Sequence, residues 1–235
     1  MIHTGAQLTG RGEWFQVAQR LVSRCVPSWL MVLDQRYLLV CRRMPSVPSE
    51  IPNDYVLAKA SFLNSVDIAE CLGDPNATEM DRRLRRFAAS GSTFYVARRA
   101  GKVCAFCRIA PDEYTVMFDG YQKFNVTVPL DPNTCVIGYI YVHPEARRRG
   151  LGAALLGHAI SQRHSSIGRM PVLSVVRPDN GGSMRMHRRV GFSVVGSYYY
   201  VASPLARVLI VRSMFSTARV YRLTGHTVVN PCKLS

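Results

Sequence analysis

The stretch that decides the fold runs from Cys135 to Leu156 and reads CVIGYIYVHPEARRRGLGAALL. Its first eight residues are nearly all apolar, as in a strand from the middle of a sheet. A turn rich in arginine and glycine follows, and the last residues are good helix formers. This order predicts an anion site, because the first N–H groups of a helix lack intrahelical partners and lie at the positive end of its dipole.

Two glycines in this turn refine the prediction. Gly150 and Gly152 let a phosphate approach the backbone without a Cβ in the way. The alternative is that these glycines serve close packing of the helix and that Arg147, Arg148 and Arg149 are solvated. The turn alone leaves both interpretations open.

Composition narrows the class of protein. The length of 235 residues favours one domain with extensions, and the hydrophobic fraction of 48% indicates a folded protein. Its 30 Lys and Arg against 15 Asp and Glu give a net charge of +15, which predicts attraction to phosphate-bearing partners. A signal-peptide pattern and an apolar run of about 18 residues are both lacking, so we expect a soluble, cytoplasmic protein. The seven cysteines form no framework and are expected to be reduced, with Cys104 and Cys107 structural.

The first quarter of the chain reads as an extension. Residues 13–25 form a basic amphipathic pattern that predicts a helix. Residues 29–43 contain two apolar runs around Asp34-Gln35, typical of a hairpin or of a continuing helix. Three prolines between residues 45 and 52 then indicate a linker. We therefore expect residues 1–53 to be an N-terminal basic extension and linker.

From residue 54 onward, strand and helix patterns alternate. Two strands joined at Ala100-Gly101 have the signature of a hairpin, and residues 111–134 suggest an inserted hairpin. The other expected strands cover residues 55–60, 135–142, 171–176 and 192–202, and the expected helices begin near 64 and cover 80–90, 150–164 and 181–190.

These motifs resemble the GNAT superfamily of acyl-CoA-dependent N-acyltransferases. Its phosphate loop, Arg/Gln-x-x-Gly-x-Gly/Ala after a Val-x-Pro strand end, is matched by residues 142–144 and 147–152. Further on, Asn180 follows a strand and Gly191-Phe192 ends a short helix, as in many family members. The resemblance covers residues 55 to about 202.

The resemblance implies an α+β (α/β) fold, with a mixed, mostly antiparallel central sheet splayed between two parallel strands and flanked by helices. The acetyltransferase domain would span residues 54–202, and residues 203–235 would add a strand or helix and a basic tail. Acetyl-CoA would be the co-substrate, without a metal. The implied cofactor-binding residues are Tyr141, Val142, Arg147, Arg148, Arg149, Gly150, Leu151, Gly152, Ala153 and Asn180. Asn180 could instead be a turn residue, and Val142 sheet core.

Two residues are candidates for catalysis. His187 occupies the position at which many family members carry a tyrosine that protonates the leaving thiolate, although a capping or exposed histidine is an equal alternative. Tyr139 could relay a proton through water, as could Tyr141 on the same face of the strand. Neither strand beside the loop carries a carboxylate, so the base would be Glu113 or Asp131, or the amine would attack already deprotonated. His143 reads as a turn residue.

The implied function is transfer of an acetyl group to a primary amine of an unknown acceptor by direct attack through a tetrahedral intermediate. The alternative is a non-catalytic GNAT-like module that binds acyl-CoA. A third alternative, a nucleic-acid binder, rests on the net charge alone, because the sequence has no known DNA-binding motif, so binding to a specific nucleic acid is not expected. The N-terminal helix, with Trp14 and Phe15, either contacts an anionic membrane peripherally or packs on its own domain. We expect a monomer or a homodimer. The acceptor pocket would be built from residues 61–90, 111–134 and about 198–215.

Overall fold

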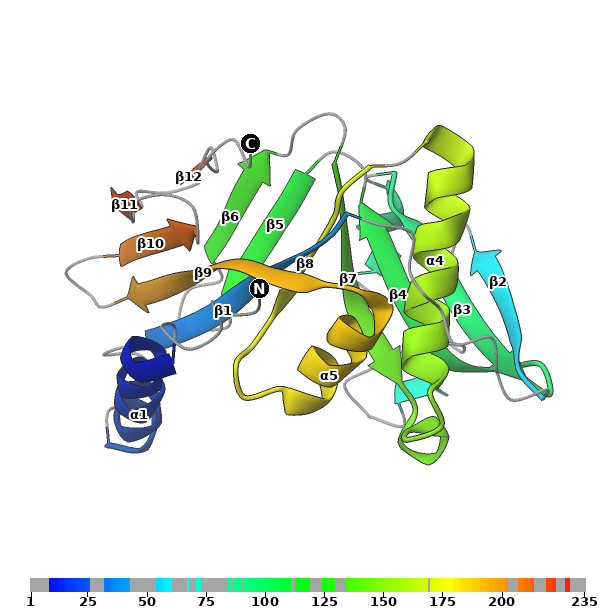
Figure 1. The fold of residues 1–235 in the computed structure, drawn as a ribbon, viewed down its shortest axis with the longest axis horizontal. Coiled ribbons are helices and arrows are strands. Elements are labelled where there is room, and N and C mark those ends of the chain that lie inside the picture. The colour runs from blue at the N-terminus through cyan, green and yellow to red at the C-terminus, as the bar shows by residue number, and fades with distance from the viewer. Residues whose placement is uncertain are drawn as a thin grey trace, which may run out of the picture.

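The computed structural model describes residues 9–25, 32–42, 54–60, 67, 71–72, 84–85, 87–89, 91–110, 113–118, 124–129, 134–168, 170–202, 207–213, 219–222 and 227–228. Its helices are α1 (Thr9–Cys25), the short 3-10 helix η1 (Pro144–Ala146), α4 (Leu151–Ile167) and α5 (Gly181–Val190). Its strands are β1 (Val32–Cys41), β2 (Val56–Ala60), β3 (Thr93–Arg99), β4 (Lys102–Ala110), β5 (Glu113–Phe118), β6 (Phe124–Pro129), β7 (Cys135–Val142), β8 (Val172–Val176), β9 (Ser193–Ala202), β10 (Arg207–Ser213), β11 (Arg219–Arg222) and β12 (Thr227–Val228). Figure 1 shows their arrangement.

The main sheet has nine strands in the order β11-β10-β9-β1-β8-β7-β4-β3-β2. Its neighbours are antiparallel except for β7 and β8, which run parallel. A second sheet contains the expected inserted hairpin, β5 with β6, and the short β12. The predicted fold class, a mostly antiparallel sheet with one parallel pair and flanking helices, is therefore confirmed.

Strand β1 corrects the predicted N-terminal boundary. It lies inside the sheet, antiparallel to β8 on one side and to β9 on the other. Residues 32–41 are therefore part of the domain and not of an extension that ends at residue 53. They form neither a hairpin nor a helix, because the strand continues through Asp34 and Gln35, both of which are buried. Asp34 accepts a hydrogen bond of 2.9 Å from Nε of Arg36 two residues on, which places an ion pair where the sequence suggests a turn.

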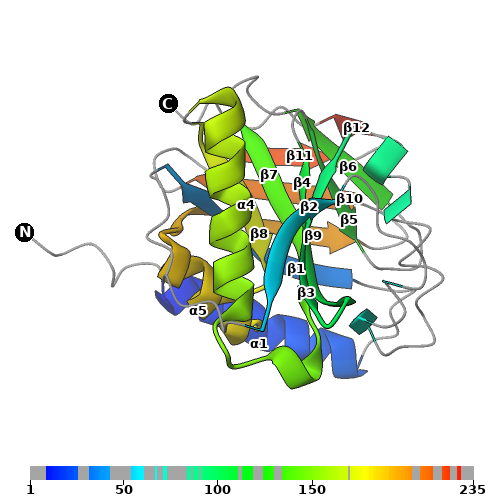
Figure 2. The ribbon, with the colours of Figure 1, turned by 90° about the vertical axis from the view of Figure 1, so that its right-hand side faces the viewer.

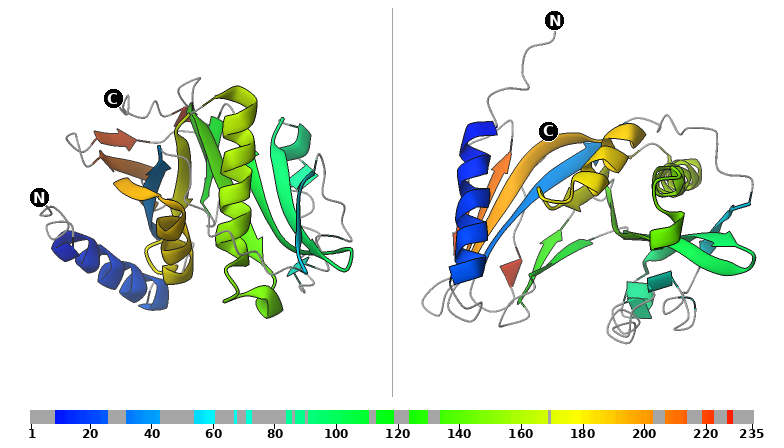
Figure 3. Two further views of the ribbon diagram at one scale, coloured as in Figure 1. Left: turned by 45° about the vertical axis from the view of Figure 1, so that its right-hand side comes forward. Right: turned by 90° about the horizontal axis from the view of Figure 1, so that it is seen from below.

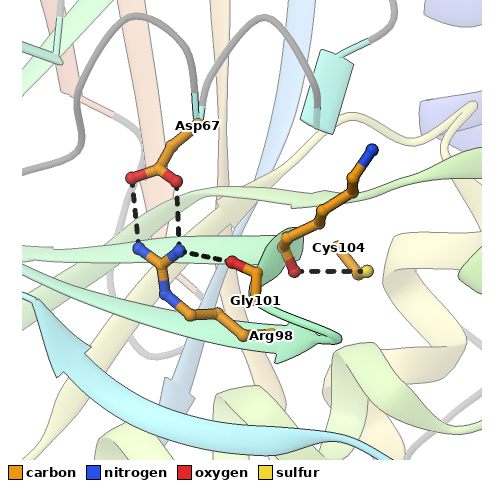
Figure 4. Close-up of polar contacts among 5 residues, drawn as sticks. Asp67, Arg98, Gly101 and Cys104 are labelled. Atoms are coloured by element: carbon orange, nitrogen blue, oxygen red, sulfur yellow. Dashed lines mark hydrogen bonds and ion pairs between the residues drawn. The ribbon is translucent and has the colours of Figure 1, made fainter.

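The hairpin of β3 and β4 turns where the sequence predicts. Ala100 and Gly101 have φ values of 49° and 80°, the left-handed conformation that a two-residue hairpin turn requires. Figure 4 shows how Arg98 ties this turn to Asp67: its guanidinium contacts both carboxylate oxygens of Asp67 at 3.1 Å and donates to the carbonyl of Gly101 at 2.9 Å. The bidentate pair fixes residue 67 against the hairpin.

Helices cover the two faces of the sheet differently. Both α4 and α5 lie on one face, in front of β7 and β4 in Figure 1 and on the same side of the sheet in Figure 3. The apolar stripe of α4, predicted from its Ala, Leu and Ile residues, includes Leu155, Leu156 and Ile160, all fully buried in the larger core. A second core on the other face contains Leu84 and Phe87 from helical residues between β2 and β3. Figure 2 shows α4 standing against the sheet from the side.

The C-terminal region, expected as a strand or a helix, forms strands. β10 pairs with β9, β11 extends the edge, and β12 adds to β6 in parallel. The described part of residues 203–235 thus completes both sheets.

Helix α1 confirms the predicted basic helix and begins four residues before it, at Thr9. It contacts β1 and lies at the end of the sheet formed by β1, β9 and β10 in Figure 3. Trp14, Val17 and Leu21 on it are 77%, 46% and 57% exposed. The helix therefore packs on its own domain while a row of apolar side chains faces solvent, and contact of this row with an anionic membrane stays a prediction. Among the described residues, no helix is both long and apolar enough to cross a membrane.

The described cysteines are free thiols. Cys107 is fully buried in the core, and Cys104 places its thiol 3.6 Å from the carbonyl of Lys102 (Figure 4). Burial raises the pKa of Cys71 to about 12 and that of Cys135 to about 11, so both stay protonated at neutral pH. The described residues contain no cluster of three or more His, Cys, Asp or Glu side chains suited to hold a metal ion.

The position of β1 predicts a large cost for shortening its core side chain. Leu39 is fully buried, so Leu39→Ala should lower the free energy of unfolding by about 2–5 kcal/mol through lost contacts and a cavity. The matched control is Val56, which is 66% exposed on edge strand β2. Val56→Ala should change the free energy of unfolding by less than about 0.5 kcal/mol. Urea denaturation measures both values. Equal costs for the two variants would contradict the place of β1 in the core.

Candidate active site

The site begins where β7 leaves β8. Only Cys135, Val136 and Ile137 pair with β8, although β7 continues to Val142. On its other edge β7 stays with β4, through a register shift in which two residues, Tyr139 and Ile140, oppose one. Tyr139 has φ 51°, a left-handed conformation that is uncommon outside glycine. This β-bulge bends β7 and opens the sheet into a wedge.

The loop after β7 sets up the start of α4. Arg148 and Gly150 both have positive φ, 64° and 77°, and Gly150 is the N-cap of α4 without a side-chain cap. The N–H of Ala154 makes the first helical hydrogen bond, to the carbonyl of Gly150, at 3.0 Å. By helix geometry, the N–H groups of the three preceding residues have no partner inside the helix. These are the N–H groups on which the predicted anion site depends.

A cavity of about 730 Å³ lies between the end of β7, this loop and α5. The described residues that line it are Ile140, Tyr141, Val142, Ala146, Arg147, Arg148, Gly150, Leu151, Gly152, Ala153, Asn180, Gly182, Ser183, Arg185, Met186 and Arg189. The structure thus brings together all the predicted cofactor-binding residues except Arg149, which is exposed beside them. The volume lies within the range of cofactor sites, about 300–1,000 Å³.

Gly152 has a packing role in this arrangement. A Cβ on it would lie 2.8 Å from Sδ of Met186 and 3.2 Å from a methyl carbon of Val142. The missing side chain therefore lets α4 approach both α5 and β7. Gly152 therefore matches the alternative interpretation, in which glycine serves close packing. Gly150 has a positive φ and open surroundings, so it shapes the loop.

Two predicted ligand-binding side chains also hold the protein together. Arg147 donates from Nε to the carbonyl of Val142 at 3.0 Å and lies 5.7 Å from the ring centre of Tyr141. Asn180 accepts from the N–H of Ser183 at 3.0 Å and so caps α5. Both side chains border the cavity, so the structural and ligand-binding interpretations are compatible.

The cavity carries strong positive charge. Arg147 and Arg148 come from the loop, and Arg185 and Arg189 come from α5. Its described lining contains no carboxylate. The two α5 arginines were missed among the predicted site residues. Their helical spacing of four, in phase with Gly182, is the signal that places them on the face of α5 that meets the loop.

His187 is not part of the cavity lining. It is 1% exposed and bridges α5 to β8: Nε2 lies 2.8 Å from the hydroxyl of Ser174, and Nδ1 lies 2.8 Å from the carbonyl of Ser183. A carbonyl only accepts, so Nδ1 carries the proton and Nε2 accepts from Ser174. Its ring also packs edge-on against Phe192. This geometry favours a structural histidine and gives no support to the predicted proton donor.

Tyr139 also lies outside the cavity lining. Its ring packs on Phe87, with centroids 4.8 Å apart, in the core on the face opposite α4. The guanidinium of the buried Arg108 covers the same Phe87 ring at 3.6 Å and donates to Ser92 at 2.8 Å. Tyr139 therefore contributes the bent backbone of the site, and its role as a proton relay stays a prediction.

Of the remaining acid–base candidates, His143 is described and is not in the cavity lining, whereas Tyr141 is. Nδ1 of His143 accepts from the N–H of Glu145 at 3.4 Å, as expected for a turn residue. Glu113 begins β5, and its side chain and Asp131 lie outside the described residues. Tyr141 donates to the carbonyl of Leu72 at 3.1 Å, which ties the wedge to the opposite layer.

A mostly antiparallel sheet that opens at one parallel pair, with an uncapped glycine-rich helix start at the opening, defines a class of acyltransferases. The chain belongs to the GNAT acetyltransferase family, whose sequence model matches residues 64–192, more than half of the chain. A comparison with curated protein sequences finds no match.

Solved structures share the fold at low sequence identity. The tandem GNAT protein from the clavulanic acid biosynthesis pathway, without AcCoA, is 14% identical with a TM-score of 0.51, over 86% of this chain and 73% of that one. A functionally unknown conserved protein from Staphylococcus epidermidis is also 14% identical with a TM-score of 0.51, over 79% and 66%. The chain spans only 57% of a Drosophila structure that it matches at 19% identity and a TM-score of 0.49.

The environment of His187 predicts acid sensitivity. Burial lowers its pKa below the ordinary 6.5, and the hydrogen bond with Ser183 opposes that shift. As pH falls through 6.5, the histidine is therefore protonated in the unfolded chain before it is protonated in the folded one. The residue should thus lower the free energy of unfolding below pH 6.5 and leave it unchanged above pH 6.5. NMR titration of the imidazole should give a pKa below 6.5 with the Nδ1–H tautomer. The thermal midpoint should fall less between pH 7.5 and 5.5 in His187→Gln than in the wild type. A pKa at or above 6.5 would contradict this assignment.

Proposed function

We propose that this protein is an N-acetyltransferase that transfers an acetyl group from acetyl-CoA to a primary amine. The observation that carries the proposal is the cavity of about 730 Å³ at the wedge, where a strand edge, a helix N-terminus and four arginines meet. Membership of the GNAT family supports acyl transfer in general. The donor and the class of acceptor are the parts that we propose.

The start of α4 would hold the diphosphate of the donor. Leu151, Gly152 and Ala153 line the cavity, and their N–H groups have no partners within the helix. A diphosphate there would accept these N–H groups and meet the positive end of the helix dipole. Arg148 adds a side-chain cation at the same place. The described residues therefore fit the diphosphate of acetyl-CoA.

The edge of β7 would hold the pantetheine arm. After Ile137 this strand no longer pairs with β8, and residues 140–142 line the cavity. The two amide groups of pantetheine can pair with such an edge as an added strand does. The thioester would then lie deeper in the wedge, near the bulge.

The transfer exchanges a C–S bond for a C–N bond and moves one proton from nitrogen to sulfur. A neutral amine attacks the thioester carbonyl carbon, the C–N bond forms, the C–S bond breaks, the nitrogen loses a proton and the thiolate gains one. The bulge leaves backbone without a ladder partner at residues 139–140, and an N–H there would stabilise the negative charge on the carbonyl oxygen. Positioning and oxyanion stabilisation are the contributions that these residues can make.

The proton transfers have no assigned side chain. The described lining of the cavity contains neither a carboxylate nor a histidine. We propose that the amine attacks in its neutral form, deprotonated in bulk water. The rate should then rise with pH until the amine is fully neutral. His187 and Tyr139 stay as predicted catalytic residues whose side chains point into packed regions.

The same observation favours the second candidate, a non-catalytic GNAT-like module that binds acyl-CoA. Such a module needs the phosphate loop and the strand edge but no acid or base. The two candidates share their binding predictions and differ in turnover.

Binding at the start of α4 can be tested with two glycines of similar conformation. Gly150→Glu places a carboxylate at the N-terminus of α4, so it should abolish the thermal stabilisation produced by coenzyme A. Gly191→Glu is the matched control: Gly191 follows the end of α5, is left-handed like Gly150 (φ 102° and ψ 14° against 77° and −8°), and is exposed outside the cavity lining. It should carry a similar strain and retain the stabilisation. Unchanged coenzyme A binding in Gly150→Glu would contradict the placement of the diphosphate at this loop.

Turnover separates the enzyme from the module. Wild-type protein with acetyl-CoA and a pool of primary amines should release free thiol and yield amines heavier by one acetyl group in mass spectrometry. A reaction without amine corrects for thioester hydrolysis. Binding of coenzyme A without acetylation of any amine in a broad pool would favour the module.

A further inference from the structure

One face of α5 turns towards the phosphate loop. Gly182, Arg185, Met186 and Arg189 have the spacing of one helical face, and all four line the cavity. The inward face of the same helix carries the buried Met184, His187 and Val190. Arg188 lies on neither face and is exposed. We call Arg185 and Arg189 the α5 arginine pair.

The two guanidinium groups reach different borders of the cavity. Nη1 of Arg189 lies 3.9 Å from the position of a Cβ on Gly150, so this side chain crosses from α5 to the loop. Nη1 of Arg185 lies 3.4 Å from the position of a Cβ on Gly181, at the start of α5. The pair therefore brackets the gap between the two helix starts.

The pair adds two cations beyond the groups that the loop offers to a diphosphate. The loop already offers the N–H groups of α4 and Arg148, while Arg147 is held by Val142 and Tyr141. Like charges four residues apart disfavour a helix. Since the described lining contains no carboxylate to neutralise them, an anion between the two arginines would relieve this repulsion.

We propose that the α5 arginine pair binds a phosphomonoester, the 3′-phosphate of coenzyme A, and thereby selects phosphorylated coenzyme A over dephospho-coenzyme A. This inference rests on the proposed function. Guanidinium groups form paired, charge-assisted hydrogen bonds with phosphate oxygens. A phosphomonoester is the anionic group that coenzyme A carries in addition to its diphosphate, and dephospho-coenzyme A lacks that group alone.

The test compares two ligands on four proteins. Affinities for coenzyme A and dephospho-coenzyme A are measured by calorimetry at fixed ionic strength for the wild type, Arg185→Gln, Arg189→Gln and the control Arg188→Gln. Arg188 is exposed on the same helix and carries the same charge, so its variant corrects for the general field of the protein. All three arginines are exposed, and melting curves verify that the variants remain folded.

The wild type should bind coenzyme A at least about tenfold more tightly than dephospho-coenzyme A, as expected for charge-assisted contacts to one phosphate. Each variant of the pair should lose most of that preference through weaker coenzyme A binding, with dephospho-coenzyme A binding little changed. Arg188→Gln should retain the preference. A preference that persists in both variants of the pair, or an equal loss for both ligands, would overturn the inference. Binding of neither ligand by the wild type would instead overturn the proposed function.

Discussion

The site depends on the early separation of β7 from its parallel neighbour. Three residue pairs join β7 to β8, and after Ile137 the two strands part. Two features keep the gap open. The bulge at Tyr139 bends β7 towards β4, and the ladder between β8 and β1 continues to Val176 and holds β8 in the sheet. This divergence creates the opening of the sheet. The free edge of β7, the uncapped start of α4 and the cationic face of α5 all border that opening.

Local signals were sufficient for the phosphate loop. A strand, a basic turn and a helix start follow one another between Cys135 and Leu156, and the positive φ of Gly150 depends on residues next to it. The hairpin at Ala100-Gly101 was predictable for the same reason. Strand β1 was not, because its stability comes from two distant strands. Asp34 and Gln35 resemble a turn in isolation, and tertiary pairing overrides that local preference.

The short helix α5 shows where motif position and helical phase give different answers. Position before Gly191-Phe192 suggested that His187 faces the cofactor. Phase places His187 on the buried stripe with Met184 and Val190, and it turns Arg185 and Arg189 to the cavity. The sequence contained this information in the spacing of its apolar residues. What it lacked was the direction of the sheet, since β8 and Ser174 decide which face is inward.

The interior place of β1 also bears on how the chain is made. Tyr37 leaves the ribosome long before Val176 and Ser197, the residues that it pairs with. At usual translation speeds this delay lasts on the order of ten seconds. For that time a short apolar strand has both of its hydrogen-bonding edges open, the condition in which strands attach to wrong partners. We therefore expect β1 of the nascent chain to need protection from wrong pairing until the last third of the chain has been synthesised. The supply of chaperones should then influence the yield of folded protein.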